Sequence, residues 1–433
     1  MTAMKRIFAL VLTLTLLLSL AVVLPAAAEQ KKPVTLETWI VQTDWSDAWD
    51  NLMKPRFEEQ YPWITLEAVG LGGSNVDYIR TRIPSGSVPD VWQVDNDPTY
   101  YNAVDEGLLV DLNTLEVSKA IPQAYRDAFT YKDKLFGLTQ GAAFSVLYLN
   151  MKILEDAGWT QAPANWEEFI RCCDDIKTKT GVAPLTLAGD KTTTCWMLFE
   201  LIAANVAGDT LGLGVFETQF LDGTLDFTAY PQISERLAQV APYMLTGTAS
   251  MTEDDVTAAM TDGTAAMAIA GNWTANNICS GIETASGDPK YVKAVLAPFN
   301  DEGKGVWISV SPETAFGLSN APADPEVLEA RELFFNWVFQ PENFAIIQNA
   351  RGTVPVLETM TAEQIKLPAA ISEIVPAMNA ASFVKMGFNL WTNEFRDAAT
   401  TALKDVYGGN REAADAVKGM TELLKTSNRA NIK

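Results

Sequence analysis

Apolar and polar positions alternate with a period of two in several short segments of this chain. Between those segments, apolar positions recur every three or four residues. The first pattern predicts strands and the second predicts amphipathic helices. Residues 34–41, 64–69 and 90–94 are predicted strands, and residues 46–61 and 76–83 are predicted helices between them. This alternating order predicts a parallel sheet with right-handed crossovers, and therefore an α/β fold.

The same patterns continue to the end of the chain. Asn165, followed three residues later by Glu168, has the spacing of a helix-capping box. The further predicted strands are 143–150, 265–270, 291–296 and 314–318, and the further predicted helices are 165–179, 195–206, 325–339, 341–350, 391–406 and 410–424. No Pro-, Gly- or Ser-rich linker divides the chain, so we expect any lobes to be interleaved in sequence.

The N-terminus has the pattern of an export signal. Lys5 and Arg6 precede an apolar run from Ile7 to Leu24, and small residues follow up to Ala28. This predicts a signal peptide over residues 1–28 that is cleaved after Ala28. The run is also long enough to remain as a membrane anchor, so cleavage and retention both stay open. In either case we expect an exported protein, periplasmic or extracellular and associated with the cell surface.

Composition excludes several function classes. The 433 residues contain 54 acidic and 32 basic side chains, a formal charge of −22, which argues against nucleic acid as a partner. Histidine is absent, which removes Ser-His-Asp and Cys-His catalysis and imidazole metal sites. We predict no metal and no cofactor. The four cysteines, which form no C-x-x-C pair, are expected to be buried thiols with at most one disulfide: Cys172, Cys173, Cys195 and Cys279.

Seven short motifs occur in a fixed order between residues 57 and 356. They are FEEQYP (57–62) with ITLE (64–67), SGSVPDV (85–91), EGLL (106–109) with DL (111–112), YLN (148–150), NWEEF (165–169), AMAIAGNW (266–273) and GTVPV (352–356). Each motif alone is weak. In this order, the set resembles the family-1 extracellular solute-binding proteins of bacterial ABC importers, the carbohydrate-binding branch that includes maltose-binding proteins.

The resemblance implies a two-lobed, type II periplasmic-binding-protein-like fold. Each lobe would be a mostly parallel sheet flanked by helices, and a hinge with several crossings would join them. By analogy, the first lobe comprises residues 29–139 and 300–354, and the second comprises residues 140–299 and 355–433. The crossings would lie near residues 139–142, 297–300 and 353–356.

The resemblance also implies a function without catalysis. A sugar or oligosaccharide would be captured in the cleft by hinge closure and delivered to the transmembrane subunits of an ABC permease. We expect a monomer that contacts the membrane only through the permease or a retained N-terminal segment.

Sugar recognition directs attention to aromatic and short polar side chains. Aromatic rings stack on the apolar faces of sugars, while carboxylates and amides bind the hydroxyls. The candidate ring platforms are Trp273, Trp45, Trp307 and Trp391, of which Trp307 is placed in a loop before the predicted strand 314–318. The candidate polar contacts are Asp95, Asp97, Asp44 and Gln140. The alternatives are core tryptophans, as we expect for Trp49, Trp92, Trp166 and Trp337, and turn-forming aspartates beside Pro98.

Two other functions remain open. A secreted glycoside hydrolase would need two carboxyl groups at a fixed separation in one cleft. The same fold could instead bind a polyamine or a peptide, and a polyamine would require several carboxylates that face the ligand.

Overall fold

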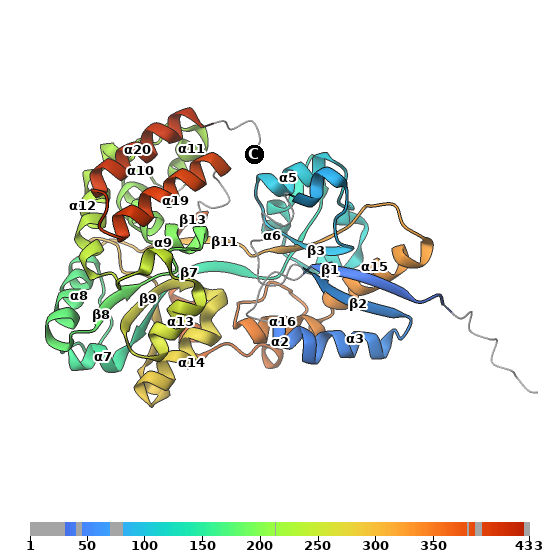
Figure 1. Ribbon diagram of the computed structural model, residues 1–433, viewed down its shortest axis with the longest axis horizontal. Helices are drawn as coiled ribbons and strands as arrows, with labels where there is room; N and C mark the ends of the chain where they lie inside the picture. Colours follow the sequence, from blue (N-terminus) through green and yellow to red (C-terminus); the bar gives the residue numbers. More distant parts are fainter. Residues whose placement is uncertain are drawn as a thin grey trace, which may run out of the picture.

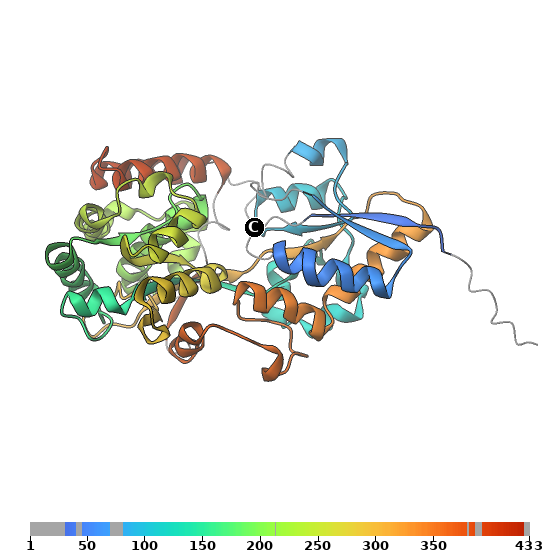
Figure 2. The ribbon, with the colours of Figure 1, turned by 60° about the horizontal axis from the view of Figure 1, so that its bottom comes forward.

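The computed structural model describes residues 31–39, 46–69, 81–212, 214–378, 381–385 and 392–427. These residues form two α/β lobes that lie side by side, each built around its own sheet (Figure 1). The view turned by 60° shows the same division (Figure 2). The two-lobed α/β prediction is therefore confirmed.

The first sheet has the strand order β2-β1-β3-β12-β6. Its strands are β1 (Val34–Trp39), β2 (Ile64–Val69), β3 (Val91–Val94), β6 (Leu138–Thr139) and β12 (Ala315–Leu318). β1 pairs in parallel with both β2 and β3, as the alternating strand and helix pattern predicted. β12 is antiparallel to β3 and to β6, so the sheet ends in strands that come from distant parts of the sequence.

Helices cover the first sheet and bury its apolar side. The helical segments that cover it include α2 (Ser46–Ala48), the π-helical turn Trp49–Met53, α3 (Lys54–Gln60), α5 (Pro98–Asp105), α6 (Gln123–Ala128), α15 (Pro325–Val338) and α16 (Pro341–Arg351). Phe57 of α3 packs edge-on against Trp337 of α15, with ring centroids 5.2 Å apart. Helices that are far apart in the sequence thus share one core.

The second sheet has the order β13-β11-β7-β9-β8, and β10 also pairs with β7. The strands are β7 (Ala142–Asn150), β8 (Ala183–Thr186), β9 (Ala265–Gly271), β10 (Val292–Val295), β11 (Trp307–Pro312) and β13 (Ser382–Lys385). All nine residues of β7 are buried. Leu147 and Leu149 enter one core cluster, whereas Phe144 and Val146 enter another. Helices must therefore cover both faces of this sheet. We expected a mostly parallel sheet in each lobe, and this one differs: it is mixed, because the central strand β7 is antiparallel to β9, β10 and β11.

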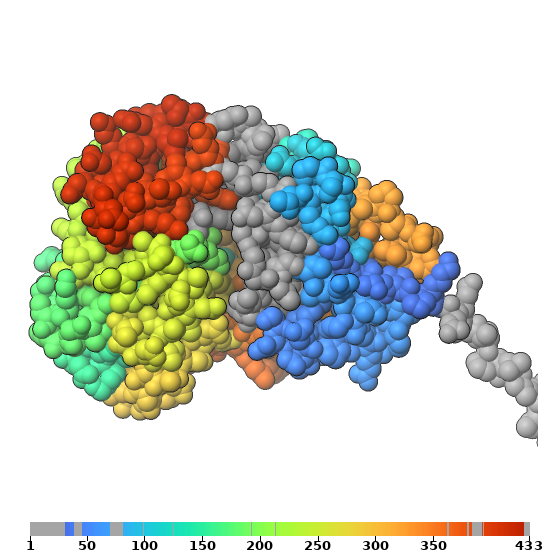
Figure 3. All heavy atoms as spheres, in the orientation of Figure 1, coloured from blue at the N-terminus to red at the C-terminus, as the bar shows by residue number. Residues whose placement is uncertain are grey.

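The helices of the second lobe come from the middle and the end of the chain, and the C-terminal helices lie against the middle segments (Figure 3). They are α7 (Met151–Asp156), α8 (Trp166–Thr180), α9 (Thr192–Ala203), α11 (Val215–Asp222), α12 (Pro231–Val240), α13 (Glu253–Thr261), α14 (Ala275–Ser286), α17 (Ala369–Met378), α19 (Asn393–Tyr407) and α20 (Ala413–Thr426). Asn165 caps α8 by accepting a hydrogen bond from the Glu168 backbone N–H at 3.0 Å, as predicted.

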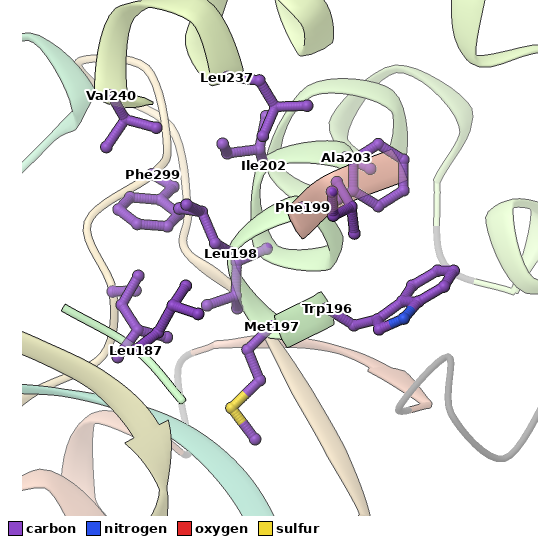
Figure 4. Close-up of a cluster of buried hydrophobic side chains, with 14 of the residues drawn as sticks. Leu187, Trp196, Met197, Leu198, Phe199, Ile202, Ala203, Leu237, Val240 and Phe299 are labelled. Carbon is purple, nitrogen blue, oxygen red and sulfur yellow. The ribbon is translucent and has the colours of Figure 1, made fainter. Parts of the chain in front are cut away.

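Helix α9 forms the centre of the largest core. Its side chains Leu198 and Ile202 point into a cluster that includes Leu237 and Val240 of α12 (Figure 4). The helix is apolar on most of its circumference because other helices and the sheet surround it. Among the described residues, no single helix is both long and apolar enough to cross a bilayer, although the bent pair Thr193–Leu211 and Val215–Asp222 reaches that level by length and composition alone.

The chain passes between the sheets in short segments. β6 ends at Thr139 and β7 begins at Ala142, and Ala142 also forms an isolated bridge with Val354. We expected the return crossing at residues 297–300, and the structure differs. β11 pairs with β7 and β13 of the second sheet, so the chain returns between Pro312 and Ala315. Trp307 accordingly begins a strand and does not lie in a loop, because WISVSP supplies the β-branched and aromatic residues that a buried strand favours.

Candidate functional site

Asp95 and Asp97 follow β3 at the carboxyl end of the parallel part of the first sheet. Asp97 is buried and caps α5, accepting hydrogen bonds from the backbone N–H groups of Thr99 at 2.9 Å and Tyr100 at 3.1 Å. The Asp95 carboxylate accepts a hydrogen bond from the Thr314 hydroxyl at 2.9 Å. Asp97 thus caps a helix, a role close to the turn-forming alternative that we considered, and both carboxylates lie where ligands bind to sheets of this type.

Arg396 of α19 meets Asp97 from the second lobe. Its Nη1 lies 3.7 Å from Asp97 Oδ2, and both side chains are buried. Burial raises the pKa of Asp97, Arg396 and the two capping N–H groups lower it, and Asp95 raises it again, so that the pKa of Asp97 is about 6. Sequence reasoning missed Arg396, because nothing in its local sequence shows that α19 faces β3 across the junction of the lobes.

Gln140 lies in a buried polar cluster at the junction of the crossings. Its backbone carbonyl accepts a hydrogen bond from Gln348 at 2.6 Å, and its side-chain oxygen lies 3.4 Å from Arg351 Nη1. Arg351 also forms an ion pair with Glu313 at 2.5 Å. Gln140 is completely buried, so this position makes it part of the hinge.

Trp273 follows β9 and is 8% exposed. Its indole N–H donates to Glu253 at 2.8 Å, and Lys191 Nζ lies 5.3 Å from the ring centroid. A Cβ placed on Gly271 would lie only 2.3 Å from the ring, so the ring packs directly on the Gly271 backbone. Because the ring is bounded by Gly271 and by the Lys191 ammonium, it has little surface left for a sugar in this conformation.

Trp307 is also buried, with 6% of its surface exposed. Its ring lies 3.2 to 3.3 Å from the position that a Cβ on Gly208 would occupy. Its backbone N–H donates to the Asn205 side chain at 2.9 Å, and its carbonyl accepts from the same amide at 3.0 Å. Asn205 and Gly208 therefore hold Trp307 in the core of the second lobe.

The remaining candidates divide into two groups. The expected core tryptophans are buried: Trp49, Trp92, Trp166 and Trp337. Trp45, Trp391 and Asp44 lie outside the described residues. Trp196, which we had not singled out, is buried in the cluster of Figure 4, and its indole N–H donates to Thr400 at 2.8 Å.

Three described cations near the junction of the lobes each have a carboxylate partner. Arg396 pairs with Asp97, Arg351 pairs with Glu313, and Lys191 pairs with Glu253 at 2.7 Å. Burial raises the pKa of Glu253, but Lys191, the Trp273 N–H and Arg351 lower it, and the balance leaves this pKa below its ordinary value. In the part of the chain that the structure describes, no group of three or more acidic or cysteine side chains is arranged to hold a metal ion.

The family model of bacterial extracellular solute-binding proteins matches residues 53–373 of this chain. The chain belongs to this family. The family and the structural neighbours named below are binding proteins and not enzymes.

Curated relatives of this solute-binding protein are distant. It is 22% identical over 184 residues to the multiple sugar-binding protein of Streptococcus mutans, a match that covers 42% of this chain and 43% of that protein. It is 22% identical over 259 residues to an uncharacterized ABC transporter extracellular-binding protein of Pyrococcus horikoshii, with 58% of this chain and 57% of the relative covered. The matches therefore span about half the length of these curated relatives.

Solved structures resemble this solute-binding protein over nearly its whole length. A chitin oligosaccharide binding protein has a TM-score of 0.75 at 20% identity, with 90% of this chain and 98% of that chain covered. A solute-binding protein in complex with raffinose has a TM-score of 0.74 at 18% identity, with 90% and 100% covered. At such low identity the similarity establishes the fold, which is the two-lobed architecture described above.

Proposed function

We propose that this solute-binding protein captures an uncharged saccharide between its lobes, outside the cytoplasmic membrane, and delivers it to the transmembrane subunits of an ABC permease. The site would lie at the junction of β3 with α19, above the hinge cluster around Gln140. The relatives and structural neighbours support a sugar, since their names include a multiple sugar-binding protein and a raffinose complex.

The observation that carries the proposal is the pairing of the cations at this junction. Among the described residues, Arg396, Arg351 and Lys191 each have a carboxylate partner, and Asp95 adds one further carboxylate beside Asp97. An uncharged ligand rich in hydroxyl groups suits such a surface, because it neither requires a surplus of one charge nor leaves a buried charge without its counterion. A polyamine would need surplus carboxylates instead.

Individual residues take different roles in this proposal. Asp97 Oδ2 accepts no hydrogen bond from the described residues, so it can accept one from a sugar hydroxyl. Asp95 and Arg396 would contribute beside it. Trp45, Trp391 and Asp44 remain proposed ligand contacts, whereas we assign Trp273, Trp307 and Gln140 to the framework that holds the site.

A thermal-shift panel tests the ligand class. We expect at least one neutral oligosaccharide, from a set of maltose-, raffinose-, chitin- and xylan-type sugars, to raise Tm. A ligand present at 100 times its Kd stabilises the native state by about 2.7 kcal/mol. Stabilisation by spermidine or by peptides, without any response to saccharides, would contradict the proposal.

Two further measurements sharpen this test. Asp95→Asn should weaken the binding of the responding sugar by roughly 1.5–3 kcal/mol, the value of a hydrogen bond to a charged group. Asp105→Asn at the exposed end of α5 is the matched control, since its carboxylate pairs with Lys132. Mass spectrometry of the recovered sugar should show it intact, and cleaved products would indicate the hydrolase alternative.

Export is tested separately from binding. We propose that the signal is removed after Ala28, so the N-terminal sequence of the secreted protein should begin at Glu29. Retention of residues 1–28 in a membrane fraction would instead indicate the anchored form.

A further inference from the structure

The second sheet divides along one edge of β7. On this edge β11 pairs with residues 142–144, and β10 pairs with residues 147–150. Ser145 and Val146 lie between the two ladders and belong to neither. β11 continues instead along β13, with which it pairs from Trp307 to Val310. The strands therefore form a fork, bounded by Ser145 and Val146 of β7 and by the part of β11 that precedes Val310.

Two serines stand directly behind the last pair of the β7–β11 ladder. That pair is Val310 of β11 with Phe144 of β7. Because the strands are antiparallel, the next residue on β11 is Ser309 and the next residue on β7 is Ser145. The two serines are thus the first side chains of the fork, one on each strand.

Both serines lie on the same side of the sheet. Side chains alternate between the faces of a strand, so Ser145 shares the face of Leu147, and Ser309 shares the face of Trp307. Leu147 and Trp307 belong to one core cluster. Helix α9 covers this side of the sheet, and its Met197 belongs to the same cluster (Figure 4).

The two hydroxyls are buried, and the described residues offer them no hydrogen bond. Ser145 is 1% exposed and Ser309 is completely buried. Neither Oγ atom has a partner among the described residues, and the two do not bond to each other. A buried hydroxyl without a partner costs free energy, and the large majority of buried side-chain polar atoms have one. One small polar molecule within reach of both would satisfy the two groups together.

We propose that an internal water molecule occupies the fork and bridges Ser145 Oγ and Ser309 Oγ. Water fits because it donates and accepts, as each hydroxyl does, and because internal waters typically bind polar groups that the protein leaves unpaired. A sugar cannot reach hydroxyls with so little exposure. The inference is therefore separate from the proposed saccharide site.

The water would join the bases of two crossings. β7 begins at Ala142, directly after the first crossing, and β11 ends at Pro312, where the return crossing starts. Their ladder has only three residue pairs. A bridge between Ser145 and Ser309 extends the connection between these strands by one position, on the second-lobe side of the hinge.

A high-resolution crystal structure tests the site directly. We expect one water within hydrogen-bond distance of both Oγ atoms in the wild-type protein, and none there in Ser145→Ala or Ser309→Ala. In solution, oxygen-17 magnetic relaxation dispersion counts long-lived internal waters. The count should fall by one in either variant and by no more than one in the double variant.

Stability measurements distinguish a shared water from two independent hydroxyls. Each single variant leaves one hydroxyl without its bridge, so the unfolding equilibrium constant should rise about fivefold in urea denaturation. The double variant should be no less stable than either single one, because no unpaired hydroxyl remains. Ser118→Ala is the matched control, since the buried Ser118 hydroxyl donates to the Leu112 carbonyl at 2.6 Å, and its loss should leave the water count unchanged.

Two results would overturn the inference. The first is a wild-type crystal structure with no water between the two hydroxyls, and the second is a water count that does not fall in Ser145→Ala or Ser309→Ala. Single variants more stable than the wild type would also contradict it, since they would show that the hydroxyls lack any compensating bond. The wild-type structure answers the question even if a variant does not fold. No sugar enters these experiments, so the result does not depend on the proposed ligand class.

Discussion

Arg351 donates to Glu313 across 2.5 Å, and both side chains are only 2% exposed. Arg351 is the last residue of α16, whereas Glu313 lies between β11 and β12, on the return crossing. The same guanidinium lies 3.4 Å from Gln140 Oε1 on the first crossing. One buried cation therefore connects three separate segments that run between the lobes.

Further hydrogen bonds brace this junction. The Thr139 hydroxyl donates to the Glu313 carbonyl at 2.7 Å, and the Glu313 N–H donates to the Gly141 carbonyl at 2.8 Å. Short segments with their backbone groups paired in this way can rotate only as a unit. We infer that the hinge moves about this cluster and does not deform within it.

Loss of the hinge cation should strongly destabilise the protein. Arg351→Met leaves the Glu313 carboxylate buried beside an apolar side chain, so we expect the free energy of unfolding to fall by about 3–5 kcal/mol. Urea denaturation at pH 7 measures the change.

The double variant Arg351→Met with Glu313→Leu should recover part of that loss, because no buried charge remains. Lys119→Met serves as the control, since Lys119 pairs with Glu116 on the surface. It should change stability by less than about 1 kcal/mol. If Arg351→Met were no more harmful than this control, the cluster would not brace the hinge.

A methyl group at Gly271 should displace Trp273. The added Cβ would lie 2.3 Å from the ring, and the ring cannot move without losing its hydrogen bond to Glu253. We expect Gly271→Ala to reduce the free energy of unfolding by about 1–3 kcal/mol, the typical cost of overpacking a core. Gly305→Ala is the matched control, because nothing lies within 4 Å of its added Cβ. Tryptophan fluorescence should shift only in Gly271→Ala, and an unchanged spectrum would show that the ring is not packed on this glycine.

The four cysteines should be unreactive in the native protein. All four are free and buried, and burial raises the pKa of Cys172, Cys195 and Cys279 to about 12. Burial also raises the pKa of Cys173. Because the thiolate is the reactive form, an aromatic disulfide reagent should titrate no thiol at pH 8 in the folded protein and four in 6 M guanidinium without reductant. Two thiols fewer in the denatured protein would reveal a disulfide.

Strands with a strong local pattern could be predicted almost to the residue. Residues 64–69 form a strand as predicted, and the predicted strand 265–270 is extended only by Gly271. In both cases apolar side chains alternate or run continuously between clear stop signals. β13 was missed, and β11 was taken for a loop although WISVSP contains β-branched and aromatic residues; both strands pair with strands that are distant in sequence.

In the candidate site, too, some residues could be predicted from their local sequence and others could not. Asp95 and Asp97 could be found because they directly follow a predicted parallel strand, where ligands bind to such sheets. The tryptophan assignments were weaker, since a ring at a strand end can face a cleft or a core with the same local sequence. Lys191 and Gly271 lie against the Trp273 ring, and Gly208 packs against the Trp307 ring.

The sequence by itself determined the α/β class, the first parallel strands, the absence of histidine chemistry and the family, because these depend on composition, local periodicity and motif order. The tertiary structure decided that Arg396 meets Asp97 and that Arg351 links three crossings. These partners are 299 and 38 residues apart in the two ion pairs, so only the folded chain brings the charges together. Burial, which no local pattern encodes, then sets their electrostatics.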